Sequence, residues 1–293
     1  MVSKKESLIY INGEYVRESE AKISVFDHGF LYGDGVFENM RAYNGVVFKL
    51  DNHLKLLYES AKGIALHIPI EITELKKDIL ETLRVNKLKD AFIKVIVTRG
   101  CGGLSIDIEK SAKPNIIIIA KEKRFFPKEA IEKGIKVITA STRRIPPNCF
   151  SVNIKSLNCL NNIIAKLEAQ PFNVSEVIML DLNGFVSEFS NGNLFYVKNN
   201  ILYTPTSKNS LPGVTRETVI NIARELGYKV VEDNIILHEL YNADEIFLTN
   251  ASSGIIPVVE VDKRKISNGK PGIITKKIIS EYILVREREG TPI

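Results

Sequence analysis

Two Asn-Gly pairs near the start of the chain constrain its fold more than any other feature. They stand at positions 12–13 and 44–45, each in the middle of an apolar, alternating stretch, residues 8–16 and residues 36–48. Asn and Gly readily adopt the backbone angles of a two-residue primed turn, which joins two antiparallel strands. The pattern therefore predicts two tight β-hairpins within the first 50 residues.

Strands and helices then follow one another without regular alternation. Apolar residues at helical spacing predict helices over residues 51–66 and 72–83 and an amphipathic helix after Lys155, which carries Leu157, Leu160, Ile163, Ile164 and Leu167. The predicted strands are residues 92–98, 115–120, 135–139, 177–180, 193–197, 201–203 and 245–248, and a further helix covers residues 215–227. This order argues against a Rossmann fold, which needs repeated βαβ units, and predicts a mixed α/β (α+β) protein.

The length of the chain, 293 residues, suits two domains that each bury a core of their own. A charged stretch with a proline follows the strand at residues 115–120. We interpret residues 122–133 as a linker between a small N-terminal α/β domain, residues 1–121, and a larger C-terminal domain, residues 134–293.

Composition excludes several classes of protein. Apolar content of 44% and charged content of 26% are ordinary for a globular protein, and no apolar run approaches the length of a membrane span. The net charge of +5 is dispersed, which argues against nucleic-acid binding but suits anionic small molecules. The three cysteines lack the spacing of a metal site, and no export signal is visible, so we expect a cytoplasmic protein without a metal.

Three polar residues could together serve pyridoxal phosphate. An amine with its ordinary pKa near 10 is protonated at neutral pH, so Lys155 needs a dry pocket and a cofactor aldehyde to act as a nucleophile. Glu188 could hold the pyridine nitrogen protonated, and Thr215 opens a helix whose free N–H groups favour a phosphate. Taken singly, each also has an ordinary interpretation: a solvated lysine, a surface acid at a hairpin end and a helix N-cap.

Four motifs, taken together and in order, resemble the class IV, fold-type IV pyridoxal-phosphate aminotransferases. They are Gly-Asp-Gly-Val-Phe-Glu at 33–38, Ile-Lys-Ser-Leu-Asn at 154–158, Gly-Phe-Val-Ser-Glu at 184–188 and Leu-Pro-Gly-Val-Thr-Arg at 211–216. Residues 26–45 are most similar to branched-chain amino acid aminotransferases of the archaeal and bacterial type. The resemblance implies a small N-terminal α/β domain, a larger barrel-like C-terminal domain, and a homodimer or higher homo-oligomer in which the partner completes each active site.

The resemblance also implies roles for individual residues. Lys155 would be the internal aldimine lysine, and the other cofactor contacts would be Glu188, Val214, Thr215 and Ser252. The substrate would meet Tyr32, Phe37, Arg41, Lys94, Ala251 and Ser252. Tyr32 and Phe37 are equally compatible with roles as core aromatic residues. Leu56 and Cys159 depart from the family, because they stand where the resemblance implies a phosphate-binding arginine and a tyrosine beside the cofactor.

The activity that the resemblance implies is transamination between an apolar, branched-chain type amino acid and 2-oxoglutarate, with small-molecule amino and 2-oxo acids as the partners. Three alternatives stay open at this point: a D-amino-acid transaminase, an aminodeoxychorismate lyase that eliminates pyruvate, and a non-catalytic member of the family. The segment after Arg99 lacks the Arg-x-His motif by which the D-specific enzymes bind the substrate carboxylate.

Overall fold

The computed structural model describes residues 6–108, 113–122 and 127–293. These residues form two compact units. Unit 1 comprises the described parts of residues 6–122 together with residues 154–158 and 286–293, and unit 2 comprises residues 127–153 and 159–285. None of the helices in the described residues combines the length and the hydropathy that a bilayer crossing requires.

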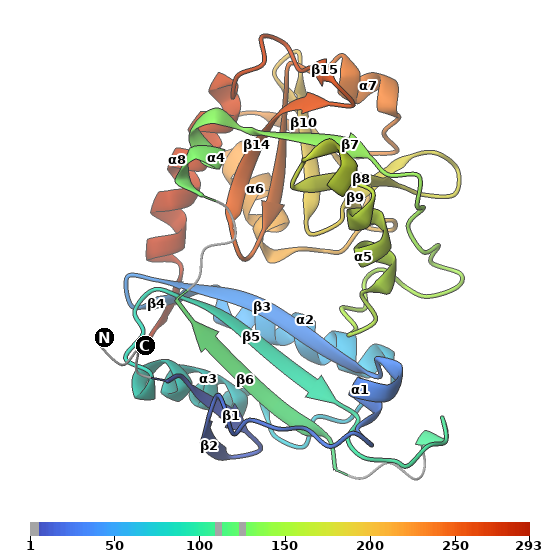
Figure 1. Ribbon diagram of the computed structural model, residues 1–293. Coiled ribbons are helices and arrows are strands. Elements are labelled where there is room, and N and C mark those ends of the chain that lie inside the picture. Colours follow the sequence, from blue (N-terminus) through green and yellow to red (C-terminus); the bar gives the residue numbers. More distant parts are fainter. Residues whose placement is uncertain (1–5, 109–112, 123–126) are drawn as a thin grey trace. The chain divides into compact units, whose positions relative to one another are not determined.

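Unit 1 is a seven-stranded sheet with helices (Figure 1). Its elements are β1 (Leu8–Ile11), β2 (Glu14–Arg17), α1 (His28–Tyr32), β3 (Gly35–Tyr43), β4 (Val46–Phe48), α2 (Leu50–Gly63), α3 (Ile72–Val85), β5 (Ala91–Thr98), β6 (Asn115–Lys121) and β16 (Gly290–Pro292). The strands lie in the order β16-β4-β3-β5-β6-β1-β2, and every pair is antiparallel.

Both predicted Asn-Gly hairpins are confirmed. β1 pairs with β2 and β3 pairs with β4, and each connection is the expected pair of residues. The φ angles are 52° and 97° at Asn12 and Gly13, and 48° and 83° at Asn44 and Gly45. These left-handed conformations suit a primed turn, and Asn and Gly tolerate them better than other residues do.

The core of unit 1 lies on the face of the sheet that α2 and α3 cover. Alternate residues of β3 and β5 are buried, as a half-covered strand requires. Leu54 and Leu57 of α2 and Leu75 and Ile79 of α3 belong to the same buried cluster, and each of them is 0% exposed. The side chains that alternate onto the opposite face of β3 and β5 are of intermediate exposure.

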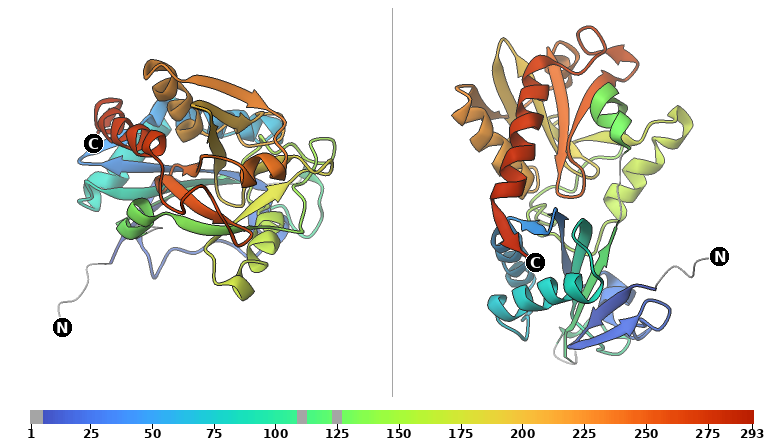
Figure 2. Two further views of the ribbon diagram at one scale, coloured as in Figure 1. Left: turned by 90° about the horizontal axis from the view of Figure 1, so that it is seen from above. Right: turned by 90° about the vertical axis from the view of Figure 1, so that its left-hand side faces the viewer.

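Two segments from late in the sequence complete one edge of this sheet. β16 pairs with β4 near the C-terminus of the chain (Figure 2). Residues 154–157 run antiparallel to the start of β3, with a bridge between Val36 and Ser156, and Ile154 packs against the core of unit 1. The two units therefore do not follow the expected domain boundaries. Lys155 lies within the expected C-terminal domain, residues 134–293, but belongs to unit 1.

Unit 2 is built on a second, mixed sheet of nine strands (Figure 1). Its elements are α4 (Lys128–Lys133), β7 (Ile135–Thr139), α5 (Leu160–Leu167), the 3-10 helix η2 (Gln170–Phe172), β8 (Glu176–Leu180), β9 (Val186–Phe189), β10 (Asn193–Lys198), β11 (Ile201–Pro205), α6 (Val214–Glu225), β12 (Lys229–Asp233), α7 (Leu237–Tyr241), β13 (Glu245–Asn250), β14 (Gly254–Val261), β15 (Arg264–Lys265) and α8 (Ile273–Arg288), of which residues 286–288 belong to unit 1.

The order of the strands explains why the second sheet is barrel-like. It runs β12-β11-β10-β13-β14-β7-β8-β9, with β15 beside β14. Parallel pairs (β11 with β12, β14 with β7, β7 with β8) occur among antiparallel ones. Bridges from Val186 to Ile235 and from Phe189 to Gly192 tie β9 back toward the other end of the sheet. The sheet thus curls around a buried cluster that includes Phe189. Two βαβ units, β7-α5-β8 and β11-α6-β12, stand among antiparallel pairs in this sheet, so βαβ units do not repeat along the described residues as they would in a Rossmann fold.

Two sequence expectations differ from the structure. The helix after Lys155 begins at Leu160, with Cys159 as its N-cap, so Leu157 lies outside it. Ala165 packs in a buried cluster, but the larger apolar residues Leu160, Ile163, Ile164 and Leu167 are 45 to 60% exposed. The expected linker includes residues 123–126, which lie outside the described part of the chain, and its second half forms α4.

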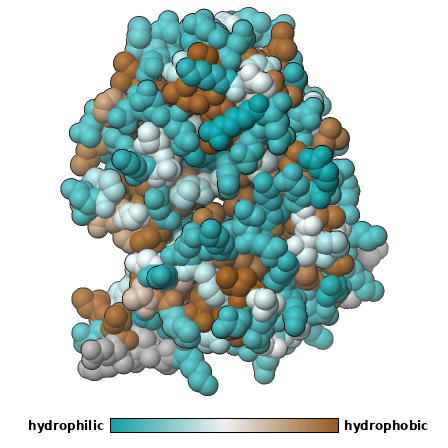
Figure 3. Space-filling model, turned by 180° about the vertical axis from the view of Figure 1, so that it is seen from behind, coloured by the Kyte–Doolittle hydropathy of each residue, from teal (hydrophilic) through white to brown (hydrophobic). Residues whose placement is uncertain are grey.

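Exposed apolar side chains also gather in unit 1. The surface seen in Figure 3 is mostly hydrophilic, with separate hydrophobic patches. Phe30 of α1 is 71% exposed. Other exposed apolar residues around α1 and in the segment that follows β5 include Val25, Phe26, Leu104, Ile106 and Ile108. Patches of this kind on a globular domain are usually covered by a partner.

Candidate active site

Lys155 lies in the short extended segment that borders β3. Its carbonyl oxygen accepts from the Phe37 N–H at 2.9 Å, and the Leu157 N–H donates to the carbonyl oxygen of Gly35 at 2.9 Å. The Lys155 N–H donates to the hydroxyl of Ser60 in α2 at 3.2 Å. The backbone is therefore held on both sides, and this fixes the direction in which the side chain leaves the sheet edge.

The amine of Lys155 is held by a buried carboxylate that the sequence analysis did not identify. Lys155 Nζ donates to Glu38 Oε1 at 2.7 Å, and His53 Nδ1 of α2 lies 3.1 Å from the same oxygen. The side chains of Glu38 and His53 are 2 and 3% exposed, and that of Lys155 is 18% exposed. The site thus has an amine, a carboxylate and an imidazole within hydrogen-bonding distance.

Strand periodicity explains how Glu38 comes to be buried. In β3 the side chains of Val36, Glu38, Met40 and Ala42 alternate onto the core face. Burial raises the pKa of the Glu38 carboxyl, but the charges and hydrogen bonds of Lys155 and His53 outweigh it, so the pKa is lowered. The sequence signal for this carboxylate is an acidic residue at a core position of a strand. A carboxylate buried in this way requires a cationic partner.

Predicted substrate residues lie on the other face of the same strands. Phe37 and Arg41 of β3 alternate away from the core, and Lys94 stands opposite Asn39 on β5. Lys94 Nζ lies 4.4 Å from the centroid of the Phe37 ring, and Lys155 Nζ lies 5.6 Å from it. The amines of Lys94 and Lys155 therefore both lie beside the ring of Phe37.

Tyr32 and Arg41 make other contacts. Tyr32 ends α1, is 40% exposed, and donates its hydroxyl to the carbonyl oxygen of Leu104 at 2.7 Å. The guanidinium of Arg41 lies 5.5 Å from the centroid of the Tyr43 ring. Tyr32 is thus not a core aromatic residue, and its hydroxyl ties α1 to the segment after β5.

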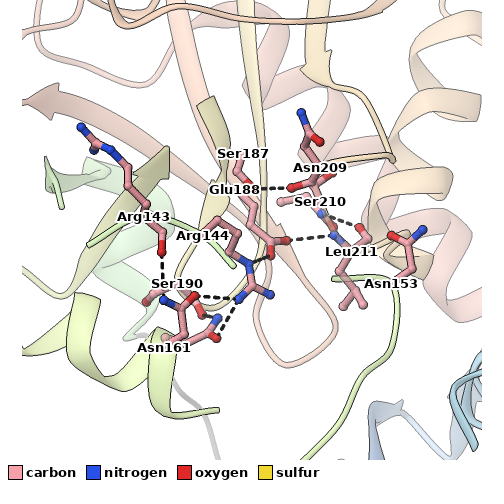
Figure 4. A network of polar contacts seen from close by, with 12 residues as sticks. Arg143, Arg144, Asn153, Asn161, Ser187, Glu188, Ser190, Asn209, Ser210 and Leu211 are labelled. Atoms are coloured by element: carbon pink, nitrogen blue, oxygen red, sulfur yellow. Dashed lines mark hydrogen bonds and ion pairs between the residues drawn. The ribbon is translucent and has the colours of Figure 1, made fainter. Parts of the chain in front are cut away.

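Glu188 is the centre of a polar network in unit 2 (Figure 4). It lies in β9, whose four residues are all buried, so it is not a surface acid at a hairpin end. Glu188 Oε1 accepts from Arg144 Nε at 2.9 Å, and Oε2 accepts from the Leu211 N–H at 3.1 Å. Arg144 Nη1 in turn donates to the side-chain oxygens of Asn161 and Asn162, both at 3.1 Å. The network fixes the carboxylate and compensates its charge.

The predicted phosphate-binding residues open α6. Val214 and Thr215 form its first turn after Gly213, and both are buried. The hydroxyl of Thr215 is buried without a hydrogen-bond partner among the described residues, which leaves it available for a ligand. Gly213 is required by close packing, because a Cβ there would lie 2.4 Å from the side-chain oxygen of Asn193.

Ala251 and Ser252 lie in the tight connection between β13 and β14. Asn250 organises it, since its side-chain oxygen accepts from Ser252 Oγ at 2.9 Å and from the Ser253 N–H at 2.8 Å. Ser252 is buried, and the hydroxyls of Ser253 and Thr249 are buried without partners in the described part of the chain. Among the described residues, unit 2 therefore has buried hydroxyls without hydrogen-bond partners at two places: Thr249 and Ser253 at this turn, and Thr215 at the start of α6.

The two residues that depart from the pattern of the resembling family lie in α2 and just before α5. Leu56 is a half-buried residue of α2, one turn from His53, and Cys159 is a half-buried cysteine just before α5. In the described residues, no three His, Cys, Asp or Glu side chains gather as a metal site would require.

Comparison with known proteins places this arrangement in a family. The family model described as "Amino-transferase class IV" matches residues 35–261. A Methanocaldococcus jannaschii protein named "Putative branched-chain-amino-acid aminotransferase" is 48% identical over 283 residues, which are 96% of this chain and 97% of that protein. The branched-chain-amino-acid aminotransferase of Escherichia coli strain K12 is 35% identical, over 95% of this chain and 92% of its own.

Solved structures agree with the sequence matches. The crystal structure of the Escherichia coli branched-chain amino acid aminotransferase has a TM-score of 0.93 and 33% identity, and the match covers 98% of this chain and 96% of that one. The branched-chain aminotransferase of the thermophilic archaeon Thermoproteus uzoniensis, solved with norvaline, has a TM-score of 0.90 and 36% identity, over 97% of this chain and 96% of its own. The chain therefore belongs to the class IV aminotransferase family, with branched-chain amino acid aminotransferases as its relatives, and has their fold.

Proposed function

We propose that this aminotransferase uses pyridoxal phosphate to move the α-amino group of a branched-chain type L-amino acid to 2-oxoglutarate. The observation that carries the proposal is the half-buried amine of Lys155, held at 2.7 Å from a buried carboxylate in a chain of this family. The relatives named for branched-chain amino acids support the substrate class.

The residues present fit pyridoxal phosphate. The hydroxyl of Thr215, which has no hydrogen-bond partner among the described residues, stands in the first turn of a helix of 12 residues, where free N–H groups favour a phosphate. Glu188 is a buried carboxylate, which suits a protonated pyridine nitrogen. Val214 and Ser252 are further candidates for the phosphate. When bound, the cofactor supplies an aldehyde that bonds amines and a ring that accepts electrons.

Each residue then has a defined task. Lys155 would hold the cofactor through Nζ, and its amine would take a proton from the substrate α-carbon as general base and donate it to the cofactor as general acid. Glu188 keeps the pyridine nitrogen protonated, and Arg144 keeps Glu188 in place. Ala251 and Ser252 are proposed to bind the substrate carboxylate through the turn before β14.

The substrate side chain is proposed to meet the partly covered face of β3 and β5. The ring of Phe37 offers apolar contact to a branched side chain, whereas Lys94 and Arg41 offer positive charge to the second carboxylate of 2-oxoglutarate. One face would thus accept both substrates in turn, since the amino donor is apolar and the acceptor is anionic.

An amino-donor screen tests the proposed function. The protein is supplied with pyridoxal phosphate, 2-oxoglutarate and the L or D enantiomer of leucine, isoleucine or valine, and glutamate is measured. We expect glutamate from the L enantiomers. Glutamate from the D enantiomers alone, or release of pyruvate from aminodeoxychorismate without any amino acceptor, would assign the chain to one of the alternative activities.

Replacing Thr215 with valine should weaken cofactor binding without harming the fold. A hydrogen bond to a charged group contributes about 1.5–3 kcal/mol, so the dissociation constant of pyridoxal phosphate should rise roughly 10- to 100-fold. The melting temperature of the cofactor-free protein should not fall, because the hydroxyl has no partner to lose among the described residues. Equilibrium titration and thermal unfolding measure the two effects.

Thr218→Val is the matched control for this variant. Thr218 lies one turn further along α6, and its hydroxyl already donates to the carbonyl oxygen of Val214 at 2.8 Å. We expect its cofactor affinity to stay at the wild-type value. Equal loss of affinity in both variants would mean that Thr215 has no direct contact with the phosphate.

We further propose that the protein is a homodimer. The support is the exposed apolar face of α5 and the apolar residues around Phe30, which a monomer would leave in water. Light scattering on the purified protein should give twice the mass of the chain. A monomer mass at micromolar concentration would contradict this proposal.

A further inference from the structure

Glu38 occupies a position that strand periodicity reserves for apolar side chains. Its neighbours on the core face of β3 are Val36 and Met40, both fully buried. An unpaired carboxylate in such a place is costly, and a chain that needed only a stable sheet would gain by placing an apolar residue there. The position therefore calls for an explanation in terms of the site.

Glu38 Oε1 is the shared acceptor for three donors. Lys155 Nζ lies at 2.7 Å, His53 Nδ1 at 3.1 Å and the backbone N–H of Asn39 at 3.1 Å. With the carboxylate ionised, the contact with His53 requires a proton on Nδ1. His53 and Asn39 can thus go on donating to Glu38 when Lys155 does not.

Titratable side chains from β3, α2 and β5 of unit 1 lie near Lys155 or near the carboxylate that it contacts. In the described residues of unit 1, Glu38 from β3 contacts Lys155 Nζ, His53 from α2 contacts the same carboxylate, and Lys94 from β5 reaches the same Phe37 ring as Lys155. Glu38 is the one anion among them. It is therefore the group that balances the positive charge of the Lys155 ammonium.

This balance has a chemical consequence. The amine bonds a carbonyl only in its neutral form, and an anion in direct contact favours the ammonium. The same contact holds Nζ at one place beside β3. We propose that Glu38 is a positioning residue that sets the pH at which Lys155 captures an aldehyde, and that His53 serves Glu38 by keeping a donor on its carboxylate after Lys155 has reacted.

The proposal rests on the proposed function. It predicts a change in a pH profile that a merely structural role of Glu38 would not produce. Glu38→Gln preserves size and an oxygen that can accept from Nζ, but it removes the charge. An opposite charge in contact shifts an ionisation by about 1–3 pH units. We therefore expect the midpoint of the pH profile for cofactor capture to fall by about 1–3 units, so that capture below the midpoint becomes at least about 10-fold faster.

The measurement is the rate at which cofactor-free protein develops visible absorbance after mixing with pyridoxal phosphate, between pH 6 and pH 10. Glu59→Gln is the matched control, because Glu59 is 56% exposed on α2 and pairs with Lys55. It should keep the wild-type midpoint. A Glu38→Gln protein that captures more slowly at every pH, with the wild-type midpoint, would overturn the proposal.

Two further variants keep the test decisive. If Glu38→Gln does not fold, Glu38→Asp replaces it. The aspartate side chain is one methylene shorter, so this variant keeps the negative charge but places it further from Lys155 Nζ. A folded Glu38→Asp protein should show a smaller fall of the midpoint, and an unchanged midpoint would overturn the proposal. His53→Gln keeps an N–H donor for Glu38 and should retain the wild-type midpoint, and a shift as large as that of Glu38→Gln would contradict the role given to His53.

Failure of this inference is distinguishable from failure of the proposed function. If the wild-type protein captures pyridoxal phosphate and Lys155→Ala does not, while Glu38→Gln keeps the wild-type midpoint, the function stands and only the role of Glu38 is wrong. If the wild-type protein captures no pyridoxal phosphate at any pH, the proposed function is wrong and the role of Glu38 falls with it.

Discussion

Replacing Lys155 with alanine is expected to abolish transamination, with a fall in kcat of at least about 100-fold. General base and acid catalysis by one side chain contributes roughly 10²–10⁴-fold, and this variant also loses the amine that bonds the cofactor. Visible absorbance from captured pyridoxal phosphate should disappear with the activity. A steady-state assay of glutamate formation and an absorbance spectrum measure the two losses.

The control for this variant is Lys55→Ala. Lys55 lies on α2, and its side chain is 75% exposed and pairs with Glu59 at 3.9 Å. Its activity and spectrum should match those of the wild type. If Lys155→Ala retained more than about a tenth of the wild-type activity, a loss well below the 10²–10⁴-fold of acid–base catalysis, Lys155 could not be the group that moves the proton.

Replacing Arg144 with leucine is expected to lower the free energy of unfolding by about 3 kcal/mol, because removing one partner of a buried ion pair leaves the other charge uncompensated. The side chains of Arg144 and Glu188 are 13 and 5% exposed, so water cannot easily take the place of the guanidinium. Of the two contacts to Glu188 described above, the one from the Leu211 N–H would remain. Urea unfolding of the cofactor-free protein measures the change.

A double variant and a neighbour sharpen this test. In Arg144→Leu with Glu188→Leu both charges are absent, and we expect much of the lost stability to return. Arg143→Leu changes a neighbour whose guanidinium donates to the carbonyl oxygen of Ala140, and it should alter stability by less than about 0.5 kcal/mol. Equal effects of Arg143→Leu and Arg144→Leu would show that the ion pair with Glu188 is not important for stability.

Local patterns predicted much of the secondary structure. The Asn-Gly turns fix both hairpins of unit 1 because the required φ angles are confined to two adjacent residues. The apolar spacing predicts that the helix after Lys155 includes Leu157, whereas the helix begins at Leu160, because the backbone of Leu157 pairs with Gly35 on β3. Spacing alone does not distinguish a residue of a helix from an apolar residue just before it.

The site was only partly predictable. Lys155, Glu188 and Thr215 stand in motifs, and the structure buries each of them or holds it in a defined contact. Their supporting residues were missed, since Arg144 lies 44 positions from Glu188 and Glu38 lies 117 positions from Lys155. Such pairs arise from strand alignment between distant segments, which the local sequence does not encode.

The central claim is that Lys155 is the lysine that bonds the cofactor. The direct measurement is to incubate the purified protein with pyridoxal phosphate, reduce it with borohydride, and locate the phosphopyridoxyl group by mass spectrometry of peptides. We predict the added mass on the peptide that contains Lys155, and its absence from the Lys155→Ala protein treated in the same way. Modification of a different lysine in place of Lys155, or no modified peptide at all, would contradict the claim.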